Sequence, residues 1–93
     1  MKQGKFYRLQ EGVQVRREKF GLLFYDYRGP RLYFVPSRDL IDDSFFTGQQ
    51  TEQELIEAVT AGQPWNHPET KARIVQILEM LEEKGLVHGQ PLC

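Results

Sequence analysis

Few residues of this chain have the type and spacing that catalysis or metal binding requires. His67 and His88 lie at opposite ends of a predicted helix, unlike the paired histidines of a helical zinc site. Cys93 is the only cysteine, which excludes a disulfide or a thiolate-clamped metal within one chain. Asp42 and Asp43 are adjacent, so on a helix their carboxylates would point in different directions and make a poor acid–base pair. We therefore expect no catalytic residue, no metal and no cofactor, and hence a protein that is not an enzyme.

The composition is that of one small domain. The chain has 93 residues, of which 40% are hydrophobic and 12% aromatic, enough for one modest core. We therefore treat residues 1–93 as a single domain. The N-terminus lacks the apolar core of a signal peptide, and no apolar run approaches the roughly 18 to 20 residues that span a bilayer. These features predict a cytoplasmic protein with no membrane partner.

Charge is distributed unevenly along the chain, although the formal net charge is only −1. Residues 1–37 hold eight Lys or Arg and three acidic residues, whereas residues 38–93 hold four and ten. Two interpretations fit this pattern. The two halves attract each other in the folded protein, or the basic half is a surface for an acidic partner. Neither sign is strong enough to indicate bulk binding of nucleic acid.

The first half of the chain has the pattern of three β-strands. Residues 13–15 alternate in polarity, and residues 20–27 and 32–35 are rich in aromatic and aliphatic side chains. The glycine and proline within residues 28–31 indicate a tight reversal, so we expect the second and third strands to form an antiparallel hairpin. Pro36 lacks a backbone donor and would end the third strand.

Three helices are predicted after the strands. Ser37 is placed to cap the first helix, and Gly48 is placed to stop it in a left-handed conformation. The apolar residues of this helix are Leu40, Ile41, Phe45 and Phe46. Residues 51–54 form a capping box for the second helix, and Gly62 would end that helix.

The third helix is predicted to begin near Pro68, because proline suits the first turn of a helix. Residues 84–86, Lys-Gly-Leu, have the pattern of a Schellman ending in which the leucine folds back onto the last turn. The apolar face of this helix consists of Ile74, Ile77, Leu78 and Leu81. The expected fold is therefore α+β, with a three-stranded antiparallel sheet over about 13–36 followed by three helices over about 38–85.

The third predicted strand would leave one edge of the sheet unpaired. Residues 32–35 are four apolar residues without charge or proline, the features with which proteins usually protect an exposed edge. An extended peptide could add to such an edge through main-chain hydrogen bonds, and side-chain pockets would give selectivity. The alternative is a strand buried completely in the core. The residues alone leave both open.

A resemblance to a known family favours the peptide-binding alternative. The pattern V-x-V-R-x-E-x-F-G-x-L-x-Y at residues 13–25, followed by L-x-F at 32–34 and the polar Ser37, resembles the chaperones of the mycofactocin system (MftB). More broadly, it is similar to the peptide-recognition domain typified by the pyrroloquinoline-quinone chaperone (PqqD). The rest of the chain matches only in layout, from the turn at Gly48 to the last helix ending at residues 84–87.

This resemblance implies a PqqD-like, winged helix-turn-helix-like recognition element for ribosomally made, modified peptides. Such a domain binds the leader of a precursor peptide and presents it to a radical S-adenosylmethionine (SAM) maturase. The leader would lie as an added strand against residues 31–35, with the third helix closing the groove, and either flank of that helix could line it. The implied peptide-binding residues are Arg31, Leu32, Tyr33, Phe34, Val35, Lys71, Arg73, Ile74, Val75, Ile77 and Met80.

The turn between the first two strands has charged residues that fit two roles. Arg16 and Glu18 fit an ion pair that holds the hairpin, which contributes roughly 0 to 1 kcal/mol when exposed. Alternatively, Arg16, Arg17 and Glu18 form a docking point for the maturase. Gly21, which follows Phe20, would permit a close backbone approach or a bulge.

Two other functions fit the predicted layout. One is a winged-helix DNA-binding module, although Glu79, Glu82 and Glu83 crowd the candidate recognition helix. The other is a regulatory subunit of an enzyme that binds no peptide. The expected partners remain a precursor leader peptide and a radical SAM maturase, without nucleic acid. The protein is expected to be a monomer or a weak dimer.

Overall fold

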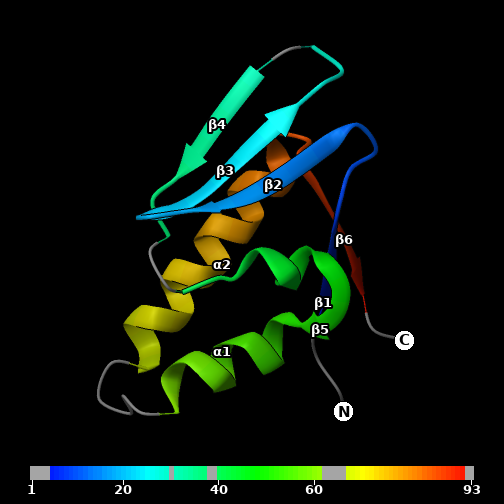
Figure 1. The fold of residues 1–93 in the computed structure, drawn as a ribbon. Coiled ribbons are helices and arrows are strands. Elements are labelled where there is room, and N and C mark those ends of the chain that lie inside the picture. Colours follow the sequence, from blue (N-terminus) through cyan, green and yellow to red (C-terminus); the bar gives the residue numbers. More distant parts are fainter. Residues whose placement is uncertain (1–4, 30, 38–39, 62–66, 92–93) are drawn as a thin grey trace.

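A computed structural model describes residues 5–29, 31–37, 40–61 and 67–91 of the chain. These residues form two three-stranded antiparallel sheets, two α-helices and one short 3-10 helix (Figure 1). The elements follow the order β1 (Lys5–Leu9), β2 (Val13–Glu18), β3 (Gly21–Asp26), β4 (Arg31–Val35), η1 (Asp43–Phe46), β5 (Thr47–Thr51), α1 (Glu52–Thr60), α2 (His67–Glu83) and β6 (Val87–Pro91).

The three strands predicted in the first half form one sheet in the order β2-β3-β4. Both pairs are antiparallel, and β3 is the central strand. Alternation along each strand gives the sheet a buried inner face, which includes Leu22, Phe24 and Val35. The opposite, outer face leaves Leu32 and Phe34 exposed. The predicted hairpin is therefore confirmed.

The second sheet, in the order β5-β1-β6, is absent from the sequence-based prediction. Its central strand β1 pairs with β6 from Lys5 opposite Pro91 to Leu9 opposite Val87, so it joins the two ends of the chain. The strands β5 (TGQQT) and β6 (VHGQP) are short and polar and contain glycine or proline. Such sequences have no hydrophobic period to indicate a strand, and they become strands here through pairing with β1.

The first predicted helix is wrong. The described part of residues 38–46 contains only the single 3-10 turn η1, and its N-cap is Asp42, whose side chain accepts a hydrogen bond from Ser44 N. Ser37 is buried but does not cap: its carbonyl accepts from Leu40 N, and its hydroxyl has no partner among the described residues. The aromatic rings of Phe45 and Phe46 enter the core from this tight turn without a regular helix.

The other two predicted helices are confirmed. Thr51 and Glu54 form the complete capping box at the start of α1, and Pro68 lies in the first turn of α2. After α2, Gly85 adopts a φ of 76° and Leu86 N donates to Leu81 O, as in a Schellman motif. Gly48 has a φ of 82°, although it lies within β5 and does not end a helix. The predicted stop at Gly62 lies outside the described residues.

The expected order of three strands followed by three helices, with its winged helix-turn-helix likeness, is therefore wrong. Strands occur at both ends of the described chain and between η1 and α1, and the described residues contain two α-helices. The missing elements depend on pairing between distant segments, which local sequence patterns do not encode. The α+β class itself is retained.

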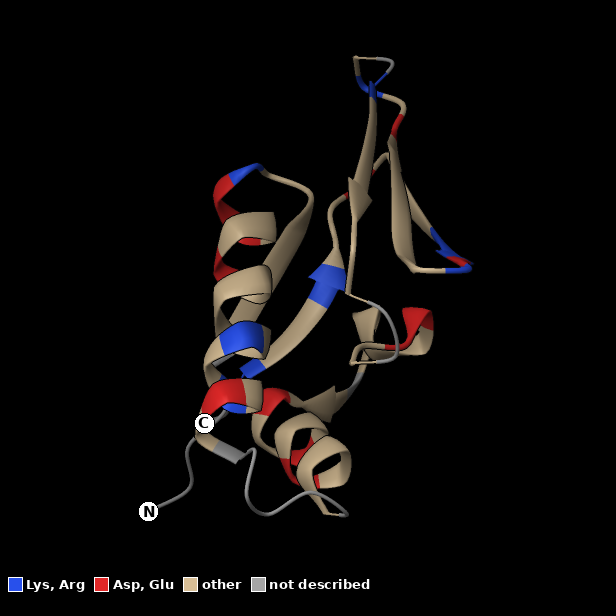
Figure 2. Cartoon of the chain, turned by 90° about the vertical axis from the view of Figure 1, so that its left-hand side faces the viewer, with Lys and Arg blue, Asp and Glu red and all other residues tan. Residues whose placement is uncertain are grey.

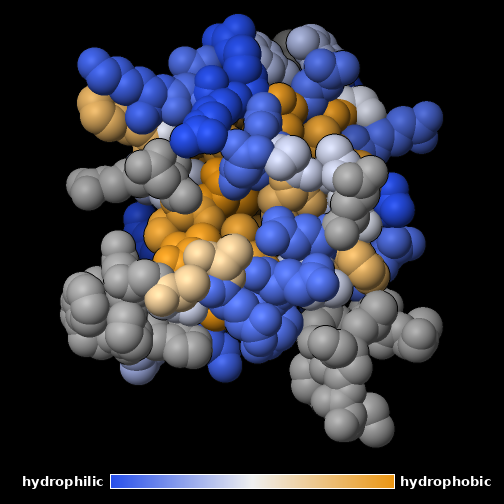
Figure 3. Space-filling model, turned by 60° about the horizontal axis from the view of Figure 1, so that its bottom comes forward, coloured by the Kyte–Doolittle hydropathy of each residue, from blue (hydrophilic) through white to orange (hydrophobic). Residues whose placement is uncertain are grey.

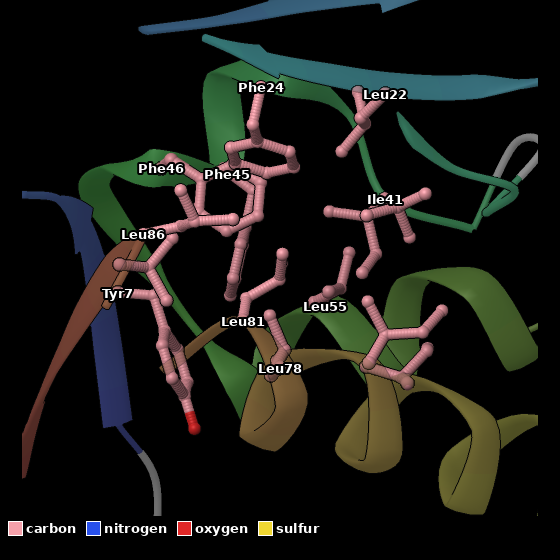
Figure 4. Close-up of a cluster of buried hydrophobic side chains, with 14 of the residues drawn as sticks. Tyr7, Leu22, Phe24, Ile41, Phe45, Phe46, Leu55, Leu78, Leu81 and Leu86 are labelled. Carbon is pink, nitrogen blue, oxygen red and sulfur yellow. The ribbon is translucent and has the colours of Figure 1, made fainter. Parts of the chain in front are cut away.

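One hydrophobic core joins the two sheets to the helices. Leu22 and Phe24 point from β3 toward Leu78 and Leu81 of α2, so α2 covers the inner face of the β2-β3-β4 sheet (Figure 4). Tyr7 of β1 is 1% exposed and brings the second sheet into the same cluster. Because the inner face is filled in this way, a ligand of the β2-β3-β4 sheet must use its edges or its outer face.

Candidate functional site

The outer edge of β4 is one of the two edges of the β2-β3-β4 sheet that are open to a ligand, β2 being the other. β4 pairs with β3 from Arg31 opposite Asp26 to Val35 opposite Leu22. Among the described residues, no strand pairs with its other edge. Alternate N–H and C=O groups of an edge strand point away from its neighbour, and they can accept an added strand. The alternative that this strand is sandwiched within the core is therefore wrong.

The side chains of β4 divide between the two faces of the sheet. Val35 is 1% exposed and Tyr33 is half-buried, and both lie on the inner face toward the core. Leu32 and Phe34 lie on the outer face and are 64% and 46% exposed. A strand added to this edge would direct its own alternate side chains to the same two faces.

One flank of α2 lies beside β4, and the contacts of Tyr33 identify it. The Tyr33 hydroxyl donates to Met80 Sδ at 3.2 Å, and Lys84 Nζ, just beyond α2, lies 5.0 Å from the centre of the Tyr33 ring. Arg73 and Ile77 precede Met80 by seven and three residues and share its side of the helix. β4 and this flank thus meet at the Tyr33–Met80 contact, and a pocket lined by Arg31, Leu32, Tyr33, Lys84 and Leu86 lies between the start of β4 and the end of α2. We call this junction the β4–α2 groove.

The remaining predicted helix residues lie elsewhere. Ile74 is fully buried and belongs to the core, so it does not line the groove. Lys71 and Val75 lie on the other flank of α2, where they line a separate shallow depression with Pro68, Ala72, Gln76 and Glu79. Of the predicted peptide-binding set on α2, the structure brings Met80 into contact with β4; Arg73 shares its side of the helix by spacing, and Ile77 does too but is buried in the core. The structure does not bring Lys71, Ile74 or Val75 to the side of β4.

A charged cluster closes the end of the groove where β4 begins. The Asp26 carboxylate is 3% exposed and accepts from Arg28 Nε at 2.9 Å and from Arg31 Nη2 at 2.7 Å. Arg28 also donates to the carbonyl of Gly85 at 2.8 Å, which ties the hairpin turn to the end of α2. Hydrogen bonds from Arg28, the larger contribution, and from Arg31 hold the pKa of the Asp26 carboxyl well below its usual range.

The charged residues at the end of β2 have internal partners. Arg16 Nε donates to Glu18 Oε2, and Arg17 Nη1 donates to Asp42 Oδ1 at 2.8 Å. The Arg16 guanidinium also lies 5.5 Å from the centre of the Tyr25 ring. These contacts hold the hairpin, as the simpler of the two interpretations predicts. Arg16 and Glu18 lie on the outer face of the sheet, because residues at alternate positions of a strand share a face.

The β2-β3-β4 sheet also has exposed large apolar side chains. Besides Leu32 and Phe34 on the outer face, Phe20 and Tyr27 lie at the two ends of β3 and are 62% and 63% exposed. Four such side chains on one small sheet are more than the scattered exposed residues of an ordinary surface. The sequence showed their hydrophobicity but not their direction, because runs of apolar residues do not reveal which side chains face the core.

The charged residues are distributed unevenly between the β2-β3-β4 sheet and the helices. Residues 13–37 hold five Lys or Arg and two acidic residues. Figure 2 shows the basic residues of this segment at the turns of the sheet and the acidic residues mainly on the helices. The described structure thus presents a basic sheet and acidic helices on separate parts of its surface. Lys5 and Glu82, 3.7 Å apart, are one pair that links the two halves.

The hydrophobic core is accessible at one side of the molecule. Figure 3 shows apolar side chains at the surface between two hydrophilic borders, on the face seen from the α1 side. The core cluster has partly buried members that can contribute accessible apolar surface: Leu9, Val15, Tyr33, Leu40, Val59, Val75 and Met80. Two of them, Tyr33 and Met80, are the residues that meet across the β4–α2 groove.

Two residues of the groove escaped the sequence-based prediction. Lys84 follows Met80 by four residues, so a helical-wheel argument that had placed Met80 could have placed Lys84 as well. Asp26 is one of the few acids in a basic segment, which is a signal for an internal ion pair. In the part of the chain that the structure describes, no cluster of His, Cys, Asp and Glu suits a metal, and no helix is long and apolar enough to cross a membrane.

Comparison with protein families gives a match that covers residues 6–88. The matching family model is described as the peptide chaperone MftB family. No curated protein and no solved structure gives a significant match. The matched segment includes all of β2, β3, β4, α1 and α2, and therefore both elements of the β4–α2 groove.

Proposed function

Because the chain belongs to the peptide chaperone MftB family, we propose that it binds the leader of a ribosomally synthesised, mycofactocin-type precursor peptide by β-strand addition. It then delivers the bound precursor to a radical SAM maturase in the cytoplasm and catalyses no reaction itself. We expect a monomer or a weak dimer, since the edge that binds the leader could also pair with a second copy. Nucleic acid is not a proposed partner, because the acidic residues lie mainly on the helices (Figure 2).

The observation that carries this proposal is the open edge of β4 beside an apolar helix flank. Main-chain hydrogen bonds to residues 31–35 would supply affinity that does not depend on the leader's sequence. Selectivity would come from leader side chains that point inward and contact Tyr33, Met80 and Ile77. Tyr33 and Met80 are partly buried at the boundary of the core and Ile77 is buried beneath them, so little rearrangement is needed to cover this surface.

A titration followed by NMR tests the binding mode. The ¹⁵N-labelled protein is titrated with the synthetic leader of the precursor encoded beside it. We expect the largest amide shifts at residues 31–35 and on the α2 flank that contains Arg73 and Met80. Amides of the new strand pairing should also exchange more slowly with solvent, because they become hydrogen-bonded.

The opposite flank of α2 is the internal control for this titration. Lys71 and Val75 lie on the same helix but face away from β4, so their amides should shift much less than those of Arg73 and Met80. Equal shifts on both flanks, or shifts confined to the β5-β1-β6 sheet, would contradict strand addition at β4.

For delivery, we propose that the maturase docks at the β2–β3 turn. Phe20 is exposed there, Lys19 Nζ lies 5.5 Å from the centre of its ring, and the Arg16–Glu18 pair is close in sequence. An exposed aromatic residue with charged neighbours is typical of an interface hot spot. This turn and the outer edge of β4 are different parts of the sheet, so leader and maturase could bind together.

Paired substitutions of exposed aromatic residues test this docking point. We expect Phe20→Ser to weaken binding to the purified maturase about tenfold, the size of a moderate hot spot, and to leave leader affinity unchanged. Tyr27→Ser is the matched control, because Tyr27 is equally exposed at the other end of β3. Isothermal titration calorimetry measures all the affinities. Unchanged maturase binding by the Phe20 variant would rule this docking point out.

A further inference from the structure

We propose that the pocket at the start of β4 binds a carboxylate of the leader, so that an Asp or Glu side chain fixes the register of the added strand. This inference rests on the proposed function and deepens it, because it names a chemical requirement on the leader. The pocket has a volume of about 150 Å³ and is lined by Asp26, Arg31, Leu32, Tyr33, Lys84 and Leu86. It therefore joins the first residues of β4 to the end of α2 and lies at one end of the β4–α2 groove.

The charges around the pocket leave an excess of positive charge. The single carboxylate of Asp26 is shared by Arg28 and Arg31. Lys84 adds a further cation, and in the described part of the chain no carboxylate lies within ion-pair distance of its Nζ. One negative and three positive charges thus surround the start of β4, which favours an anionic ligand.

Arg31 and Lys84 both have donors that can reach such a ligand. The Arg31 side chain is 67% exposed, and a guanidinium has five N–H groups, more than its contact with Asp26 uses. Lys84 is exposed and lies over the ring of Tyr33, a contact that leaves its N–H groups able to turn toward the groove. A carboxylate between these two cations would receive charge-assisted hydrogen bonds from both sides.

Apolar walls strengthen the selectivity of this pocket. Leu86 is 3% exposed at its base, and Leu32 and Tyr33 contribute further carbon surface. These walls suit the methylene groups of Asp or Glu. They also displace water around the carboxylate, so that its attraction to Arg31 and Lys84 is stronger than it would be in bulk solvent.

The location of the pocket favours a peptide over a free anion. Three of its six lining residues belong to β4, the strand whose edge is open. A strand added there directs every second side chain to the inner face, where the pocket lies. One acidic side chain held at this end would select a single register, which main-chain hydrogen bonds alone leave free to slip by two residues.

Selection from a displayed library of random peptides of about ten residues, enough for one strand, tests the proposal. The protein is immobilised as wild type, as Lys84→Glu and as Lys71→Glu. We expect peptides that bind wild type to contain Asp or Glu at one fixed position of an otherwise apolar alternating pattern. Lys84→Glu should replace that preference with Lys or Arg, because the substitution inverts the charge at one side of the pocket.

Lys71→Glu is the matched control, since it makes the same charge change on the α2 flank that faces away from β4. It should retain the acidic preference of wild type. For one selected acidic peptide, we expect Lys84→Glu to weaken binding about tenfold or more and Lys84→Gln to have a smaller effect, as removing one charge-assisted bond would. Circular dichroism checks that each variant is folded.

The outcomes separate the two proposals. Peptides that shift the amides of residues 31–35 but show no acidic preference, or the same preference with Lys84→Glu, would overturn the carboxylate pocket and leave strand addition standing. A library from which no peptide shifts those amides would overturn strand addition and the pocket together. An acidic preference that both Lys84→Glu and Lys71→Glu abolish would show nonspecific charge attraction and would also overturn the pocket.

Discussion

Replacing Gly21 with alanine is expected to destabilise the β2-β3-β4 sheet strongly. A Cβ at this position would lie 1.9 Å from the carbonyl oxygen of Val35 and 2.8 Å from Ser37 N, both of which are backbone atoms. Backbone held in a sheet cannot move aside like a flexible side chain, so the strand pairing itself must shift. We expect a loss of about 3 kcal/mol or more in the free energy of unfolding, at the upper end for overpacked sites. Because a domain of this size has about 5 to 15 kcal/mol in total, this loss would remove between about a fifth and more than half of its stability and lower the urea midpoint accordingly.

Gly29→Ala is the control for this substitution. A Cβ on Gly29 would have no neighbour within 4 Å, so the change should be nearly neutral. Urea unfolding followed by circular dichroism gives the free energy for both variants. Equal midpoints would show that the approach of Gly21 to residues 35–37 is looser than the structure indicates. The close approach confirms the prediction from the sequence that this glycine has a structural role.

The second large effect is expected from Met80→Glu, which should weaken leader binding about a hundredfold, or about 2.7 kcal/mol. Met80 is half-buried and contacts Tyr33, so it forms the apolar part of the groove wall. Glutamate would remove that surface. It would also place a carboxylate one turn before Lys84, where covering it with an inward-pointing leader side chain costs desolvation and where it would occupy the Lys84 cation.

Val75→Glu is the matched control for Met80→Glu. Both residues are half-buried on the same helix, but Val75 lies on the flank that faces away from β4. Fluorescence anisotropy of a labelled leader measures the affinity, and thermal unfolding of each free variant separates lost binding from lost stability. If the two variants lose equal affinity at equal stability, the leader does not bind along the Met80 flank.

The correct predictions and the wrong ones differ in how far apart the interacting residues are in the sequence. The capping box of Thr51 and Glu54 and the Schellman ending at Gly85 involve residues within one turn of a helix. The hairpin of β3 and β4 needs only a short reversal between two apolar strands. In each case, the residues that decide the structure are neighbours in the chain, so their pattern is visible in the sequence.

The second sheet and η1 depend on distant partners. β6 becomes a strand because Val87 pairs with Leu9, which is at the other end of the chain. The segment around Phe45 and Phe46 forms a single 3-10 turn because both rings pack into a core that already contains Tyr7 and Phe24. Those contacts outweigh the local helical pattern that the sequence indicates.

The sequence by itself determined the antiparallel hairpin, the two capped helices and the apolar strand at residues 32–35 that has no protecting charge or proline. Its resemblance to the peptide chaperones also indicated the family that the comparison confirmed. Only the tertiary structure decided which flank of α2 faces β4, because the position of a helix relative to a strand depends on packing across the whole core. The same packing placed Lys84 beside Tyr33 and brought Asp26 to Arg28 and Arg31, and these contacts give the groove a charged end.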